Sequence, residues 1–158
     1  MMNARTWCLA FFLVITTALT SAQVIIDEDG LYRNENNELY TGTYMEFHTN
    51  GNKKIELTLE KGIPNGPVTL YFESGAKSEI RSYKNGLMDG TWTTWNEAGV
   101  KIGLANYSEN LKHGEWFIWD DEGTLRFEMH YTDGKKTGVW KMYNEKGELV
   151  SESDKGKL

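Results

Sequence analysis

Hydrophobic and polar residues alternate in two kinds of short run, which follow each other from about residue 42 to the end of the chain. One run is short and aromatic, as in Trp116–Trp119, and the other is longer, as in Phe127, Met129 and Tyr131. Alternation of this kind is typical of β-strands with one buried face. No segment after residue 22 shows sustained helical periodicity. The pattern therefore predicts an all-β protein.

The runs recur every 24 residues, and glycines mark two positions in each period. A turn such as Asp120-Asp121-Glu122-Gly123 fits a type I turn closed by a left-handed residue, the usual three-residue hairpin loop with a bulge. The links between hairpins are too short for parallel crossovers, so the prediction is an elongated single-layer antiparallel meander of about 11 or 12 strands. The repeated turn glycines are Gly42, Gly51, Gly66, Gly75, Gly90, Gly99, Gly114, Gly123, Gly138 and Gly147.

Aromatic residues form columns, because an even period of 24 places equivalent residues on the same face of a sheet. One column holds Trp92, Trp116 and Trp140, and a second column on the opposite face holds Phe47, Tyr71, Trp95, Trp119 and Tyr143. The third column is Leu59, Tyr83, Tyr107 and Tyr131. These rings could serve only to bury sheet surface.

A single-layer sheet, however, cannot bury both of its own faces, and exposed rigid aromatics are favoured anchors for partners. The large aromatic residues are concentrated in the third to fifth copies of the repeat. If the rings served only the fold, each copy should need them about equally. We therefore predict a binding face that contains Trp92, Trp95, Trp116, Trp119, Trp140 and Tyr143.

Residues 1–22 differ in kind from the rest of the chain. Arg5 precedes the apolar run Trp7–Ile15, and small residues lead up to Ala22. This arrangement is typical of a cleaved secretory signal peptide, and the apolar run is too short to span a bilayer. We expect export to the periplasm, the cell envelope or the medium. Residues 23–41 are then N-terminal capping strands, residues 42–152 are five repeats of which the last is truncated, and residues 153–158 are a polar tail.

Charge and composition exclude several functions. The full chain has a net charge of −6, and loss of residues 1–22 would remove Arg5 and the single cysteine, Cys8. An acidic protein is a poor match for nucleic acid or for an anionic membrane surface. His48, His113 and His130 lack metal-ligand spacing, and no phosphate-binding glycine loop or nucleophile motif is present. We expect no enzyme activity, no cofactor and no metal.

The pattern G-x-W-x-x-W/Y-x-x-x-G, followed by a strand that ends in Tyr, Lys or Asp, and Gly, resembles the bacterial variant of the MORN repeat. The resemblance extends from Gly42 to about Val150, in five copies. It implies an elongated β-hairpin meander. Bacterial proteins of this type are often labelled YwqK-family antitoxins, which implies binding and neutralising a toxin protein.

The leading functional hypothesis is an exported non-enzymatic scaffold that binds another protein through one face or edge of the sheet. Two alternatives remain open. An antitoxin or immunity-type neutraliser would follow from the family label. A glycan- or cell-wall-binding module would use the exposed Trp columns, because aromatic rings suit sugar rings.

Overall fold

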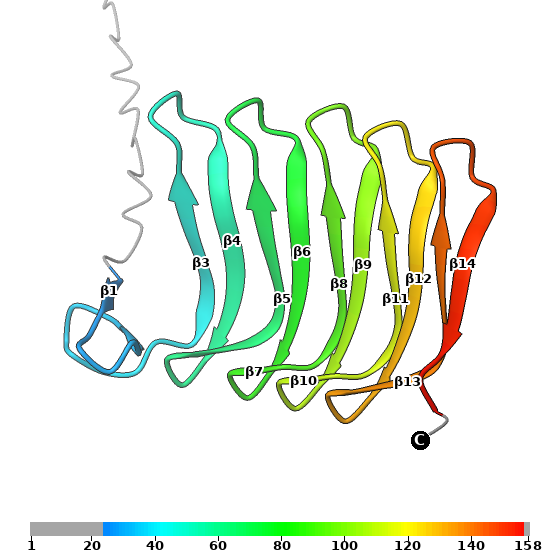
Figure 1. The fold of residues 1–158 in the computed structure, drawn as a ribbon. Coiled ribbons are helices and arrows are strands. Elements are labelled where there is room, and N and C mark those ends of the chain that lie inside the picture. The colour runs from blue at the N-terminus through cyan, green and yellow to red at the C-terminus, as the bar shows by residue number, and fades with distance from the viewer. Residues whose placement is uncertain (1–23, 157–158) are drawn as a thin grey trace, which may run out of the picture.

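The computed structural model describes residues 24–156, and it forms one sheet layer with a small lead-in at the N-terminal end (Figure 1). The sheet has 12 strands, all neighbouring pairs are antiparallel, and the main strands lie in chain order from β3 to β14. The predicted all-β meander is thus confirmed. Its main strands are β3 (Gly42–Phe47), β4 (Lys53–Glu60), β5 (Ile63–Tyr71), β6 (Lys77–Lys84), β8 (Gly90–Trp95), β9 (Lys101–Ser108), β11 (Gly114–Trp119), β12 (Leu125–Thr132), β13 (Lys135–Tyr143) and β14 (Leu149–Asp154).

Two of the repeats divide their first strand into a short and a long piece. The short pieces are β7 (Leu87–Met88) and β10 (Leu111–Lys112), which pair with β6 and β9. A single residue separates each of them from the following long strand, Asp89 before β8 and His113 before β11. In the second and fifth repeats the same segment is continuous, as β5 and β13. The second to fifth repeats therefore share one architecture, whereas β3 of the first repeat begins at Gly42.

The hairpin turns have the geometry that the glycine spacing predicts. In the turn between β11 and β12, the N–H of Asp120 donates to the carbonyl of Thr124, and the N–H of Gly123 donates to the carbonyl of Asp120, both at 3.0 Å. Gly123 has a φ of 87°, and a β-bulge follows Ile118. All ten repeat glycines have a positive φ, between 62° and 148°. These positions favour glycine because a side chain is strained there.

The turns at the other end of the sheet also contain a repeated glycine, which is replaced only by Asn110. Each has two consecutive residues of positive φ, which is the signature of a type I′ turn. The N–H of the second turn residue donates to a carbonyl of the preceding repeat, as from Gly134 to Lys112 at 2.8 Å, or of the lead-in, as from Gly62 to Tyr40 at 2.8 Å. These bonds join successive repeats at this end. The four pairs are Lys61-Gly62, Asn85-Gly86, Glu109-Asn110 and Asp133-Gly134.

The lead-in packs over the first repeats and covers the most buried part of the protein. It contains β1 (Ile25–Ile26) and β2 (Tyr32–Arg33), which pair with each other. Tyr32 packs against the buried cluster of Leu57, Leu59 and Val68, and its N–H donates to the carbonyl of Gly62 at 3.0 Å. The largest apolar burial is therefore at the N-terminal end of the sheet.

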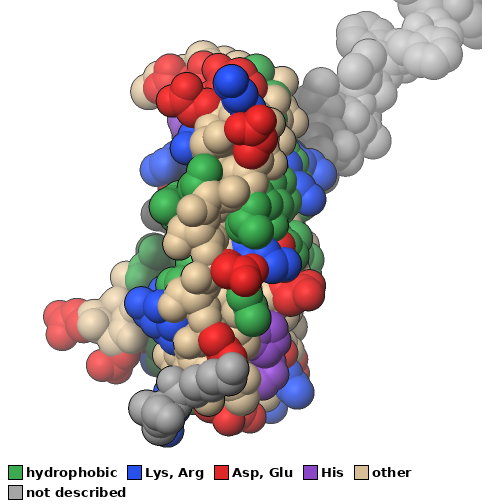
Figure 2. Space-filling view, turned by 45° about the vertical axis from the view of Figure 1, so that its right-hand side comes forward, with side chains coloured by type: hydrophobic (Ala, Val, Ile, Leu, Met, Phe, Trp, Pro, Cys, Tyr) green, Lys and Arg blue, Asp and Glu red, His purple; other side chains and the backbone are tan. Residues whose placement is uncertain are grey.

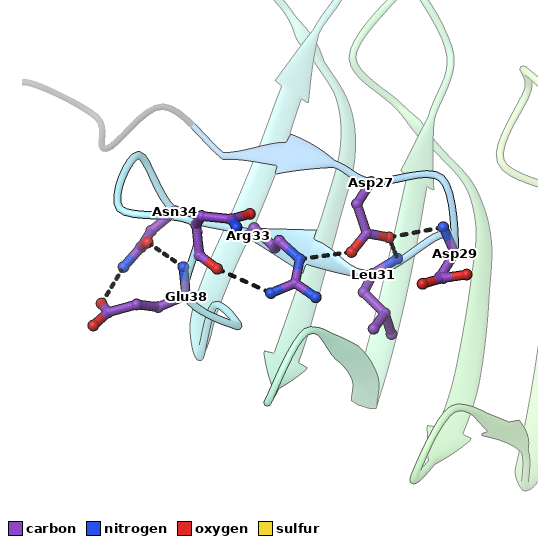
Figure 3. Close-up of polar contacts among 7 residues, drawn as sticks. Asp27, Asp29, Leu31, Arg33, Asn34 and Glu38 are labelled. Carbon is purple, nitrogen blue, oxygen red and sulfur yellow. Dashed lines mark hydrogen bonds and ion pairs between the residues drawn. The ribbon is translucent and has the colours of Figure 1, made fainter.

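An ion pair fixes the lead-in loops (Figure 3). Nε of Arg33 lies 2.6 Å from Oδ2 of Asp27, and the guanidinium also donates to the carbonyl of Asn37 at 2.9 Å. Oδ1 of Asp27 accepts the N–H of Leu31 and of Asp29. The hydrogen bond from Arg33 is the main cause that lowers the pKa of Asp27 below its ordinary value. Asp27 is therefore held as an anion that organises this turn.

The predicted signal peptide, residues 1–22, lies outside the described residues, as do residues 157 and 158. Within the described chain, β14 continues to Asp154, two residues past the expected end of the last repeat. No helix of residues 24–156 is long and apolar enough to cross a membrane.

Candidate binding face

One face of the sheet carries an unbroken row of alternating Tyr and Trp rings, and we call it the ladder face. Trp116 lies opposite Met129 and diagonal to Tyr131, so the two rings meet on the same face. The 24-residue period repeats this contact along the sheet. Neighbouring ring centroids are 4.8–5.7 Å apart. The row consists of Tyr83, Trp92, Tyr107, Trp116, Tyr131 and Trp140.

Each Trp of the ladder also makes a hydrogen bond that recurs in the third, fourth and fifth copies. The indole N–H donates to the backbone carbonyl of the residue ten positions earlier, on the preceding strand. The N···O distance is 3.2 Å for Trp92, 3.0 Å for Trp116 and 3.1 Å for Trp140. The ladder tryptophans therefore have a structural role in joining one repeat to the next, whatever else they bind.

Cationic side chains lie over the ladder rings. The guanidinium carbon of Arg81 is 5.1 Å from the ring centroid of Trp92. Nζ of Lys112 is 4.6 Å from the centroid of Trp116, and Nζ of Lys136 is 4.5 Å from that of Trp140. Such contacts stabilise the arrangement by about 0.5–1 kcal/mol at exposed sites. They also place positive charge beside each Trp.

A hollow of about 360 Å³ lies on the ladder face at the C-terminal end of the sheet, and we call it the C-terminal trough. Ile118, Phe127 and Met142 lie opposite one another across β11, β12 and β13. They are 43%, 38% and 41% exposed, high values for large apolar side chains that share one surface. The complete lining is Ile118, Phe127, Met129, Trp140, Lys141, Met142, Ser151, Ser153 and Lys155.

A second hollow, of about 310 Å³, continues along the ladder face between Trp92 and Trp116. It exists because β9 carries Gly103 and Ala105 at positions where β12 carries Phe127 and Met129, one period later. The small side chains leave the space open. The exposed apolar surface of the ladder face therefore lies mainly in the last two repeats.

The opposite face carries the other aromatic column, and its rings have different partners. The Trp119 ring stacks on Phe117 at 5.6 Å, with Nζ of Lys101 at 4.6 Å from its centroid. The hydroxyl of Tyr143 donates to Glu128 at 3.0 Å. Trp95 occupies the equivalent position in the third repeat. The six predicted binding residues are thus divided between the two faces, three on each.

Several ionisable groups of the described chain are held by local hydrogen bonds. Residues 24–156 contain no group of three or more His, Cys, Asp or Glu side chains placed to hold a metal. His48 contacts the carbonyl of Tyr71, and His130 contacts the hydroxyl of Thr137. Burial, assisted by a hydrogen bond to Glu46, raises the pKa of Tyr44 to about 12. Such a phenol stays neutral at ordinary pH and offers no general base.

Sequence reasoning missed the apolar residues of the trough. Ile118, Phe127, Met129 and Met142 were expected only as strand residues. The missing signal was a comparison of equivalent positions between repeats. Such a comparison places Ile118 and Met142 at the position of Thr94 in the third repeat, and it places Phe127 and Met129 at the positions of Gly103 and Ala105. It indicates that the apolar content of the ladder face is low in the third repeat and rises again in the last two, where no lead-in covers it.

Comparison with known families supports this architecture. Residues 112–133 and 136–154 match the family model described as MORN repeat variant. The two matched segments include β11 to β14 and most of the lining of the C-terminal trough. No curated protein matched the sequence. The match supports a MORN-repeat protein, and the same 24-residue spacing of glycines continues back to Gly42.

Proposed function

We propose that the protein is an exported, non-enzymatic repeat scaffold that binds another protein through the ladder face. The observation that carries this proposal is the C-terminal trough, with its exposed Ile118, Phe127 and Met142. MORN repeats are generally associated with scaffolds that bind proteins or membranes. Of the predicted binding residues, Trp92, Trp116 and Trp140 lie on this face and frame its hollows.

The ring contacts favour a protein over a glycan. A sugar needs an open aromatic surface on which to stack. Trp116 and Trp140, however, are packed against Tyr rings, with a lysine ammonium within 4.6 Å of each centroid. Side chains such as Met142 instead offer a soft apolar surface, which is typical of adaptable protein contacts. Neutralisation of a toxin would be one form of such binding.

Export is part of the proposal and rests on the signal-like residues 1–22. The expected mature protein begins at or near Gln23. The intact mass of protein recovered from the envelope or the medium tests this. Recovery of the chain with Met1 and Cys8 retained would contradict it.

Two methionines of nearly equal exposure provide a matched test of the binding face. Met142 is 41% exposed on the ladder face, and Met45 is 42% exposed on the opposite face. We expect Met142→Asp to abolish capture of a partner from an extract of the source organism. Met45→Asp should leave the same partner bound, and Trp95→Ala and Trp119→Ala test the opposite-face aromatics in the same assay. Equal capture by both Asp variants, with both proteins folded, would refute the assignment of the ladder face.

A further inference from the structure

The charges around the C-terminal trough are arranged in a definite order. On the ladder face of the last two repeats, the described strand positions hold apolar residues, small residues, serines and Lys136, but no acid. The strand acids of these repeats, such as Glu115 and Glu128, line a hollow on the opposite face. The chain as a whole has a net charge of −6. A surface free of acids is therefore unusual on this protein.

Lysines border the trough at the end of the sheet that carries the type I′ turns. Lys112 and Lys136 lie over Trp116 and Trp140, and Nζ of Lys155 is 5.9 Å from the centroid of Trp140. Lys155 also lines the trough itself. We call Lys112, Lys136 and Lys155 the lysine strip. The acid next to Lys155 in sequence, Asp154, lies opposite Val139 on the other face, and Glu109 and Asp133 lie in the turns beyond the strip.

Acidic residues border the trough at its other end. The hairpin turns beyond Ile118 and Met142 carry exposed acids, namely Asp121, Glu122, Glu145 and Glu148. Figure 2 shows acidic side chains at the top of the molecule and others further down, with hydrophobic and basic side chains beside one another along its length. The exposed apolar residues of the C-terminal trough thus lie between acidic turns at one end and the lysine strip at the other. A broad anionic surface such as a membrane would meet both borders at once.

We infer that the trough binds an acidic protein segment in which apolar side chains lie next to carboxylates. This inference rests on the proposed function and adds the chemistry of the partner. The apolar side chains fill the trough over Ile118, Phe127 and Met142, and the carboxylates face the lysine strip. Ion pairs of this kind contribute mainly to orientation and to the rate of association. The net negative charge of the rest of the protein repels an acidic segment and so disfavours its binding at other surfaces.

The test uses synthetic ten-residue peptides titrated against the folded protein by fluorescence anisotropy. One peptide alternates Leu and Glu, and the matched neutral peptide alternates Leu and Ser. We expect the acidic peptide to bind more tightly, and its affinity to fall about 10-fold in the triple variant K112Q/K136Q/K155Q. The control variant K77Q/K84Q/K146Q removes the same total charge from exposed lysines outside the strip, and we expect it to change the affinity by less than about 2-fold.

Several results would overturn the inference. They are no binding of the acidic peptide, equal affinity for the neutral peptide, or equal weakening in the two triple variants. Vesicles of phosphatidylserine and phosphatidylcholine form a further arm, and binding to them without binding to the acidic peptide would also overturn it. If the acidic peptide fails while partner capture still depends on Met142, the proposed function stands and only the partner chemistry is wrong. Circular dichroism of each triple variant confirms that it is folded.

Discussion

Replacing Trp116 by Phe tests the structural role of the ladder. The substitution keeps an aromatic ring but removes the indole N–H that donates to the carbonyl of Asn106 at 3.0 Å. That carbonyl also accepts the N–H of His113 at 2.9 Å, so it is not left without a partner. The cost is therefore that of one ordinary hydrogen bond, about 1 kcal/mol, rather than the larger penalty of an orphaned buried group.

Two smaller losses add to this cost. The Phe ring interacts less strongly with Lys112, whose Nζ lies 4.6 Å from the indole centroid, at a cost of about 0.5 kcal/mol. It also buries less apolar area against Tyr107 and Tyr131, at a cost of about 0.5 kcal/mol. We expect Trp116→Phe to lower the free energy of unfolding by about 2 kcal/mol, which corresponds to a decrease of about 6 °C in Tm.

The assay is chemical denaturation followed by circular dichroism, and the matched control is Trp119→Phe. Trp119 lies on the opposite face, and its indole N–H makes no hydrogen bond within the described chain. The control should therefore lose about 1 kcal/mol or less. The slope of the unfolding free energy against denaturant concentration should be the same in the two variants if both expose the same surface on unfolding. Equal losses for Trp116→Phe and Trp119→Phe would refute the structural role of the indole hydrogen bond.

Two further predictions concern the turn glycine Gly123 and the phenol of Tyr44. Gly123→Val should destabilise the protein by about 2 kcal/mol, because Gly123 has a φ of 87° and a Cβ there would lie 3.2 Å from Cγ1 of Val100. Denaturation of Glu122→Val is the control, and equal tolerance of both variants would contradict the turn assignment. Because the pKa of Tyr44 is raised to about 12 in the folded protein, from about 10 in the unfolded chain, its stabilising contribution is complete below pH 10 and is lost as the pH rises toward 12. Ultraviolet difference titration against Tyr44→Phe measures this, and a Tyr44 component near pH 10 would contradict it.

The repeat period allowed much of the fold to be predicted from the sequence. An even spacing fixes the face of each residue, so the separation of Trp116 from Trp119 onto opposite faces followed directly. The turn glycines followed equally well, because few residues other than glycine accept a positive φ. The signal-peptide prediction concerns residues 1–22 and is not tested by the described residues.

Other features depend on strand register, which the period alone does not supply. The indole hydrogen bond needs Trp116 to reach across to Asn106, a contact set by the diagonal pairing of β9 with β11. The type I′ turns include Lys61 and Glu109, residue types that do not by themselves indicate a positive φ. The hollow at Gly103 arises from the absence of side-chain volume. It therefore becomes visible only when the neighbouring strands are in place.

Site-specific photocrosslinking tests the central claim most directly. Ile118 on the ladder face and Val139 on the opposite face are 43% and 44% exposed, so a benzoylphenylalanine placed at either position is about equally accessible. Each variant is incubated with an extract of the source organism, irradiated and analysed by mass spectrometry. The ladder-face account predicts a crosslinked protein at position 118 and none at position 139. Crosslinking of the same protein at position 139, with none at position 118, would contradict it.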